Sequence, residues 1–179
     1  STPSDPEPSK PVVKAKRTKV NDQALSSKFS ITTGKTIKVT WGKVAKADGY
    51  EVYMAYCKKG KYTVVKSVKA AKTLSVTINK LNKKTVNQKD NVKCYVVAYK
   101  KVDGKKVTIG KSITGHAVGK KNTTVTDVKK IQIKKSAYSL KKGKTAKIKA
   151  TIVKKNNKKL QQKIISETCL LYTSPSPRD

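Results

Sequence analysis

The residues that could do chemistry are few in this sequence, and they are scattered along it. It has one histidine, His116, and ten acidic residues against 43 lysines and arginines. Catalysis needs titratable groups that converge on one point, and no close pair of carboxylates suggests cleavage of a glycosidic bond. Asp48, Asp90 and Asp103 lie at turn signals, where an aspartate stabilises the local backbone. We therefore expect no enzyme activity, no catalytic residue and no cofactor, and we expect His116 to be an exposed surface residue.

Motifs that hold phosphates, nucleophiles or metals are also missing. The sequence has no glycine-rich phosphate loop and no G-x-S-x-G nucleophile elbow. A calcium loop would need several acids close together, and no segment supplies them. The cysteines Cys57, Cys94 and Cys169 include no C-x-x-C pair. We therefore expect no metal site.

The charge is the most unusual property of the composition. The formal net charge is +33, and only Arg17 and Arg178 are arginines, so 43 − 2 = 41 residues are lysines. Lysine is a hydrated point charge, whereas arginine has the planar fork that grips phosphate or guanine. Dispersed lysines attract polyanions of any kind, but they predict no sequence-specific binding to nucleic acid. One interpretation is a soluble surface that resists strand pairing, and the other is attraction to anionic cell-wall polymers.

A candidate binding surface comes from tyrosines at outward positions of the expected strands. We expect Tyr53, Tyr62 and Tyr99 to be exposed and to form a small aromatic surface, with Lys38 as an outward-facing cation. Tyrosine offers an apolar ring and a polar hydroxyl, which suits contact with sugars or proteins. The possible partners are therefore anionic cell-wall polymers, carbohydrates or protein ligands.

Two alternating runs, Thr36–Gly42 and Tyr50–Cys57, organise the expected fold. Strict alternation is typical of a half-buried strand. It places Trp41 inside from the first run, and Tyr50 and Val52 inside from the second. Two such runs with a turn between them predict a hairpin or a corner of a sandwich.

The remaining strand candidates follow at near-regular spacing. They are Tyr62–Lys69, Leu74–Leu81, Val92–Val102 and Lys106–Val118. Asp103-Gly104 indicates a tight turn with positive φ angles. Between residues 12 and 30, Val20, Ala24, Leu25 and Phe29 suggest a short first strand or a loose edge segment. We see no apolar period typical of a helix, so we predict an all-β sandwich or barrel.

The order of several motifs resembles a bacterial fibronectin type III domain over about residues 20–119. The resemblance rests on Trp41, Gly49-Tyr50-Glu51-Val52-Tyr53, Lys61-Tyr62, Leu81 before a long turn, and Val96-Val97-Ala98-Tyr99 before an Asp-Gly turn. It implies an immunoglobulin-like β-sandwich. Members of the family usually have a tyrosine six residues before the alanine that corresponds to Ala98, and this tyrosine makes a hydrogen bond at a corner of the sandwich. This sequence has Val92 at that position. The corner hydrogen bond is then missing, or Tyr95 supplies it from a shifted register.

The same alternation predicts on which face of its strand each of two cysteines lies. In the strand Val92–Val102 it places Val92, Cys94, Val96 and Ala98 inside, whereas Cys57 points outward. A disulfide between Cys57 and Cys94 would need a bulge or a register shift. Their pairing stays open at this point.

The second half of the chain suggests further units. The alternating run in 127–168, with the turn Ser139-Leu140-Lys141-Lys142-Gly143-Lys144-Thr145, resembles the start of a bacterial Ig-like (group 2) domain and is shorter than such a domain. We expect a linker at 1–19, which is rich in proline and serine, and a second linker at 120–126. In the second, Asn122-Thr123-Thr124 matches the sequence pattern of a glycosylation site, but we interpret it as part of a polar linker. Residues 169–179 resemble a translated sequencing adapter, so we expect them to be an artefactual tail.

Together these patterns predict a non-catalytic structural or interaction module of a secreted or cell-surface bacterial protein. It would act as a spacer or adhesion domain and would be a monomer. The alternative is an accessory domain of an extracellular carbohydrate-active or other hydrolase whose catalytic domain lies outside this fragment. No run of about 18 apolar residues is present, so we expect no transmembrane segment.

Overall fold

The computed structural model describes residues 15–58, 60–69, 73–134, 137, 139–145 and 147–160. The elements in this part of the chain are, in order, α1 (Lys19–Ser27), β1 (Ser30–Thr33), β2 (Ile37–Thr40), β3 (Gly49–Tyr56), β4 (Thr63–Lys69), β5 (Ser75–Ile78), β6 (Lys80–Leu81), β7 (Lys84–Thr85), β8 (Val92–Val102), β9 (Lys105–Lys111), β10 (Gly115–Ala117), β11 (Val125–Thr126), β12 (Val128–Ile133), β13 (Ala150–Lys154) and β14 (Lys159–Leu160). Strands dominate, so the expected all-β class is confirmed. Among the described residues, no helix has the length and apolar character needed to cross a bilayer.

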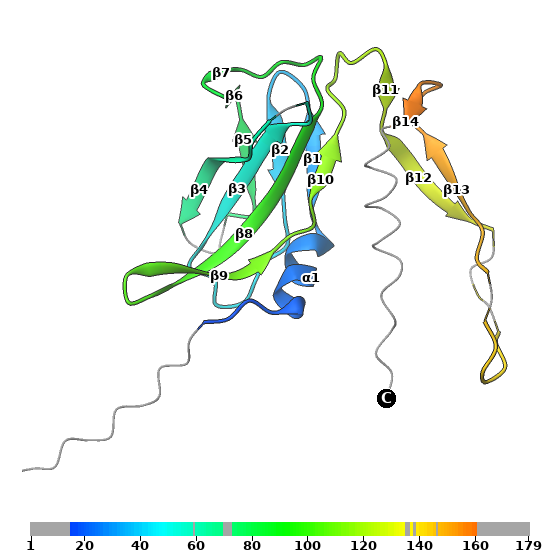
Figure 1. Cartoon of the computed structure of the whole chain (residues 1–179), viewed down its shortest axis with the longest axis horizontal. Coiled ribbons are helices and arrows are strands. Elements are labelled where there is room, and N and C mark those ends of the chain that lie inside the picture. Colours follow the sequence, from blue (N-terminus) through cyan, green and yellow to red (C-terminus); the bar gives the residue numbers. More distant parts are fainter. Residues whose placement is uncertain are drawn as a thin grey trace, which may run out of the picture.

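Two antiparallel sheets build the first and larger part of the molecule. One sheet has the order β1-β2-β5, and the other has the order β10-β8-β3-β4, with β9 also paired to β8. Figure 1 shows the two sheets packed face to face, with α1 at one end and the short β6–β7 hairpin at the other. This is a sandwich-type architecture.

The runs that we took as the organising pair correspond to β2 and β3. The two strands belong to different sheets, because β2 pairs with β1 and β5 while β3 pairs with β4 and β8. The chain therefore turns a corner of the sandwich between them. The corner interpretation is confirmed and the hairpin interpretation is wrong.

The core lies between the two sheets, on the faces that alternation predicts. Trp41 is 1% exposed and Tyr50 is fully buried, with ring centroids 5.4 Å apart at an interplanar angle of 56°. The Tyr50 hydroxyl accepts a hydrogen bond of 3.0 Å from the Val44 backbone N–H, so its one polar atom is satisfied inside the core. From β8, the expected set Val92, Cys94, Val96 and Ala98 is also buried.

Helix α1 corrects our expectation for the segment around Val20 and Leu25. That segment is neither a strand nor a loose edge. Thr18 caps the helix, since its hydroxyl accepts from the Asn21 N–H at 3.2 Å. Leu25 is fully buried and Ala24 packs against the core partly buried, whereas Val20 is 72% exposed. Two adjacent apolar contacts leave little periodicity in the sequence, and the pattern therefore did not reveal the helix.

Side chains of α1 bind the outer edge of β9 and the residues that follow it. Asn21 Nδ2 donates to the Ile109 carbonyl at 2.6 Å. Asp22 Oδ1 accepts from the Lys111 N–H at 2.6 Å, and Ser26 Oγ accepts from the Ile113 N–H at 3.0 Å. The helix thus satisfies backbone groups that β8, on the other side of β9, does not reach.

Two expectations about turns have clear outcomes. Asp103 and Gly104 have φ angles of 50° and 74°, so the tight turn with positive φ is confirmed. Tyr95 lies on the outer face of the sheet and supplies no corner bond. Instead the Tyr56 hydroxyl accepts from the Asn87 N–H at 2.8 Å, just ahead of β8.

The described residues after 119 form two small strand pairs. β11 pairs with β14 in parallel, and β12 pairs with β13 antiparallel. The expected linker 120–126 therefore ends in strand β11. Ile133, Leu140 and Ile148 are about half exposed, unlike the core residues of the sandwich. The expectations for 1–14, for 161–168 and for the tail 169–179 lie outside the described residues.

Candidate binding surface

Three tyrosines gather on the outer face of the sheet that contains β3 and β8. Tyr53 and Tyr95 are register partners, and their rings stack with centroids 4.9 Å apart at an angle of 9°. Tyr62 precedes β4 and meets Tyr95 edge to face, with centroids 4.8 Å apart at 61°. Alternation explains the placement, because Tyr53 lies between buried Val52 and Met54 on β3.

Two lysines cover rings of this group, and a third covers the nearby ring of Tyr99. Lys111 Nζ lies 4.2 Å from the centroid of Tyr95, and Lys93 Nζ lies 4.8 Å from that of Tyr62. Lys106 Nζ lies 4.6 Å from the centroid of the neighbouring Tyr99. A cation over an aromatic face is attracted by the ring quadrupole, so each ammonium group is held on this face. We call the set Tyr53, Tyr62, Tyr95, Lys93, Lys106 and Lys111 the tyrosine–lysine surface.

One acid, Glu51, ties two members of this surface together. Its Oε1 accepts from Lys106 Nζ, and its Oε2 accepts from the Tyr53 hydroxyl at 3.0 Å. The hydrogen bond from Lys106 lowers the pKa of Glu51, partial burial opposes that change, and the bond from Tyr53 adds to it. Burial raises the pKa of Tyr53, and the Glu51 carboxylate raises it further. The phenol of Tyr53 is therefore neutral at physiological pH.

The four residues that we predicted for a binding surface do not all meet. The structure brings Tyr53 and Tyr62 together and adds Tyr95, which the outward parity of β8 could have indicated. Tyr99 was expected to be exposed, and this is wrong, since only 3% of it is accessible. It is opposite Gly49 in the register, where the absent side chain leaves room for its ring. Lys38 lies on β2, in the other sheet.

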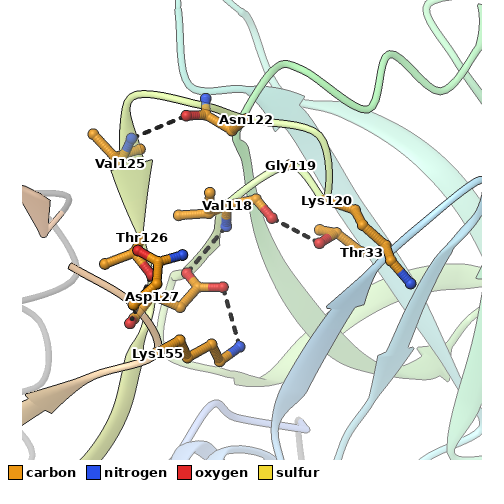
Figure 2. Close-up of a pocket in the computed structure, with 10 residues that line it drawn as sticks. Thr33, Val118, Gly119, Lys120, Asn122, Val125, Thr126, Asp127 and Lys155 are labelled. Atoms are coloured by element: carbon orange, nitrogen blue, oxygen red, sulfur yellow. Dashed lines mark hydrogen bonds and ion pairs between the residues drawn. The ribbon is translucent and has the colours of Figure 1, made fainter. Parts of the chain in front are cut away.

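A polar cavity of about 260 Å³ lies where the sandwich meets β11 and is shown in Figure 2. Asp127 is its central group. Its Oδ1 accepts from the Val118 N–H at 3.1 Å, and its Oδ2 accepts from Lys155 Nζ at 3.3 Å. Thr33 donates to the Val118 carbonyl at 2.6 Å. These bonds connect the sandwich to the residues around β11, and we call this region the joint.

Asn122 makes a second set of bonds at the same joint. Its Nδ2 donates to the Lys89 carbonyl at 2.8 Å and to Asn91 Oδ1 at 3.2 Å. Its Oδ1 accepts from the backbone N–H groups of Thr124 and Val125 at 2.9 and 3.0 Å. Both ends of the sequon amide are therefore engaged in contacts within the chain. A glycan on Nδ2 would compete with the two bonds that this nitrogen donates.

The aspartates that the sequence places at turns stabilise loops and do not converge on one site. Asp48 Oδ2 accepts from the Lys101 N–H at 2.6 Å and Asp90 Oδ2 accepts from Asn87 Nδ2 at 2.8 Å, so both stabilise loops. Among the described residues, no three His, Cys, Asp or Glu side chains are grouped to hold a metal ion.

Cys94 lies where the sequence indicated, whereas His116 does not. Cys94 faces the core, and no disulfide joins it to Cys57. His116 was expected to be exposed, and this is wrong. It is half-buried on β10, with Nδ1 3.4 Å from the Sγ of Cys57.

Comparison of the sequence with models of known protein families, and with curated proteins, found no match.

Proposed function

We propose that this chain is a non-catalytic structural and interaction module of a secreted or cell-surface bacterial protein. It acts as a spacer or adhesion domain, and it adheres through the tyrosine–lysine surface to anionic polymers of the cell wall. The observation that carries the proposal is the arrangement of Lys93, Lys106 and Lys111 over tyrosine rings on one sheet face. The resemblance to fibronectin type III domains supports the same assignment.

Preorganised cations explain why this face is favoured over the many other lysines. A free lysine side chain loses rotamer entropy when it binds an anion, of about 1.5–2 kcal/mol. A lysine already held over a ring has lost part of that freedom, which lowers the cost of binding. Tyr62 at the edge of the patch offers apolar surface to a sugar or polyol chain. The net charge of +33 draws polyanions toward the molecule from any side.

The spacer role is supported by the joint around Asn122 and Asp127. Lys121 N donates to the Gln88 carbonyl at 2.9 Å, and Lys155 N donates to the Asp127 carbonyl at 3.1 Å. These bonds, with those of the Asn122 amide, connect the sandwich to the strands that follow. A joint of this kind restricts bending between successive units, as a spacer requires.

The test compares two triple variants that remove the same number of charges. The first is Lys93→Gln, Lys106→Gln and Lys111→Gln on the tyrosine–lysine surface. The second is Lys35→Gln, Lys38→Gln and Lys80→Gln, three exposed lysines elsewhere. Binding to a poly(glycerol phosphate) polymer is measured by calorimetry at low salt, with dextran as the uncharged control. We expect the first variant to lose about tenfold more affinity than the second.

Equal losses in the two variants would show that net charge alone drives the binding, and would overturn this surface as the site. An equally strong interaction with dextran would contradict the anionic nature of the ligand. Because counterion release weakens charge-driven binding, the wild-type affinity must also fall as salt is raised.

A further inference from the structure

Cys57 and His116 form a close thiol–imidazole pair that the tyrosine–lysine surface does not include. Cys57 directly follows β3, and its backbone N–H donates to the Asn91 carbonyl at 2.8 Å. His116 lies on β10, in register with Lys93 of β8. The sheet therefore brings together two side chains 59 residues apart, with Sγ and Nδ1 separated by 3.4 Å.

This geometry suits proton transfer from sulfur to nitrogen. When Nδ1 is unprotonated, the Cys57 thiol donates its hydrogen to it, and transfer of that proton leaves a thiolate beside an imidazolium. A neighbouring cation favours the thiolate, which is the nucleophilic form of cysteine. Cys94 provides the contrast within the same protein. It is fully buried, and burial raises the pKa of its thiol to about 12.

A cavity of about 320 Å³ is lined in part by Cys57 and offers room for a small reagent. Its lining includes Cys57, Lys58, Asp90, Asn122 and Thr124. A lysine and an aspartate in one cavity are complementary to a molecule that carries both a carboxylate and an ammonium group. The volume is at the lower end of the range for ligand sites of about 300–1,000 Å³.

We propose that Cys57 and His116 form a thiol–disulfide exchange site for small amino-acid disulfides such as cystine. His116 Nδ1 takes the proton of the Cys57 thiol. The thiolate attacks one sulfur of the disulfide, a new S–S bond forms to Cys57, and the S–S bond of the reagent breaks. The departing thiolate takes up the proton from His116 and leaves as a thiol. The reagent is the oxidant, and the protein ends as a mixed disulfide at Cys57.

The test uses the full chain and cystine at neutral pH. Mass spectrometry of peptides follows the adducts at Cys57, Cys94 and Cys169 separately, in native buffer and in denaturing urea. We expect the native protein to form the adduct at Cys57 and not at Cys94. The variant His116→Gln should slow the native reaction of Cys57 about tenfold, while the rates in urea and the rate at Cys169 stay unchanged.

A second variant tests the cavity independently of His116. Thr124 is exposed at its rim, and Thr124→Trp fills the space without removing a core residue. It should slow exchange with cystine several-fold and leave the reaction of Cys57 with iodoacetamide unaltered. The proposal fails if Cys57 forms no adduct in the native protein, or if His116→Gln leaves its rate unaltered. An unchanged cystine rate in Thr124→Trp would overturn the cavity as the binding place.

Discussion

The ring of Tyr99 lies directly over Gly49, its register partner across β3 and β8. A Cβ atom at Gly49 would fall 2.4 Å from the Tyr99 hydroxyl oxygen and 2.4 Å from the backbone oxygen of Val68. The glycine is therefore required for close packing on two sides. One of those neighbours is backbone, which cannot turn away as a flexible side chain can.

This contact predicts the effect of Gly49→Ala. Overpacking of this kind costs about 1–3 kcal/mol, and we expect a loss of that size in the free energy of unfolding. The measurement is urea unfolding followed by tryptophan fluorescence, since Trp41 is the only tryptophan. The matched control is Gly34→Ala, where the nearest atom is at an ordinary 3.6 Å. Equal stability of Gly49→Ala and wild type would contradict the packing of Tyr99.

Replacing Trp41 by alanine should destabilise the fold more than Gly49→Ala does, and replacing it by phenylalanine should destabilise the fold less than alanine does. Trp41→Ala should cost about 3–5 kcal/mol, because it removes a large, fully enclosed side chain, which is enough to unfold a marginal domain. Trp41→Phe should cost much less, since the indole Nε1 has no hydrogen-bond partner among the described residues and no hydrogen bond is lost. Thermal melting by circular dichroism measures both. A melting temperature unchanged in Trp41→Ala would exclude the proposed core.

The hydrogen bonds of Asn122 predict that its substitution destabilises the backbone only near Val125. In Asn122→Ala, the backbone N–H groups of Thr124 and Val125 lose the acceptor oxygen that now binds them. Leaving the part-buried Val125 N–H unsatisfied costs about 1–3 kcal/mol. Hydrogen exchange at Val125 should therefore become faster, while exchange in β3 and β8 stays slow. The exposed Asn157→Ala is the control. Unaltered exchange at Val125 would mean that the amide is not holding the joint.

The lowered pKa of Glu51 predicts that the stability of the fold depends on pH. Its pKa is lower in the folded protein than in the unfolded chain, where it is about 4.3. Its ionised form therefore stabilises the fold above about pH 4.3, and this contribution is lost as the pH falls through the lower folded value. Glu51→Gln removes it altogether. The stability difference between wild type and Glu51→Gln should be constant near neutral pH and shrink below about pH 4.3.

Urea unfolding at a series of pH values measures that difference. Exposed Asp103, at the tip of the β8–β9 turn, gives the control substitution Asp103→Asn, which keeps a residue suited to positive φ. A difference that grows on acidification would have the wrong sign for a lowered folded pKa.

The inward faces of β2, β3 and β8 could be predicted because alternation is a direct consequence of the strand pleat. The same rule gave the buried position of Cys94 and the outward position of Tyr53. It does not say which sheet a strand joins, so Thr36–Tyr56 was equally compatible with a hairpin and with a corner. Only the pairing of β2 with β5 and of β3 with β8 separates the two.

Other features depend on contacts between distant segments. Tyr99 has the outward parity that predicts exposure, yet it is buried because Gly49, far away in sequence, leaves space for its ring. The Cys57–His116 pair exists because β10 lies beside β8. Helix α1 depends on the cap at Thr18 and on the single buried Leu25. In each case the local sequence pattern says little about the contact that determines the structure.

The hydrogen bonds from α1 to Ile109, Lys111 and Ile113 have a consequence for self-association. An edge strand with open N–H and C=O groups is a template onto which a second molecule can add its own strand. Asn21, Asp22 and Ser26 occupy those groups with side chains, which offer no further edge to extend. The helix thus closes the β9 edge of this sheet to strand addition by a neighbouring copy. A chain shortened to begin after Ser27 would lose the core residue Leu25 and would also leave this edge open to strand addition by a second molecule.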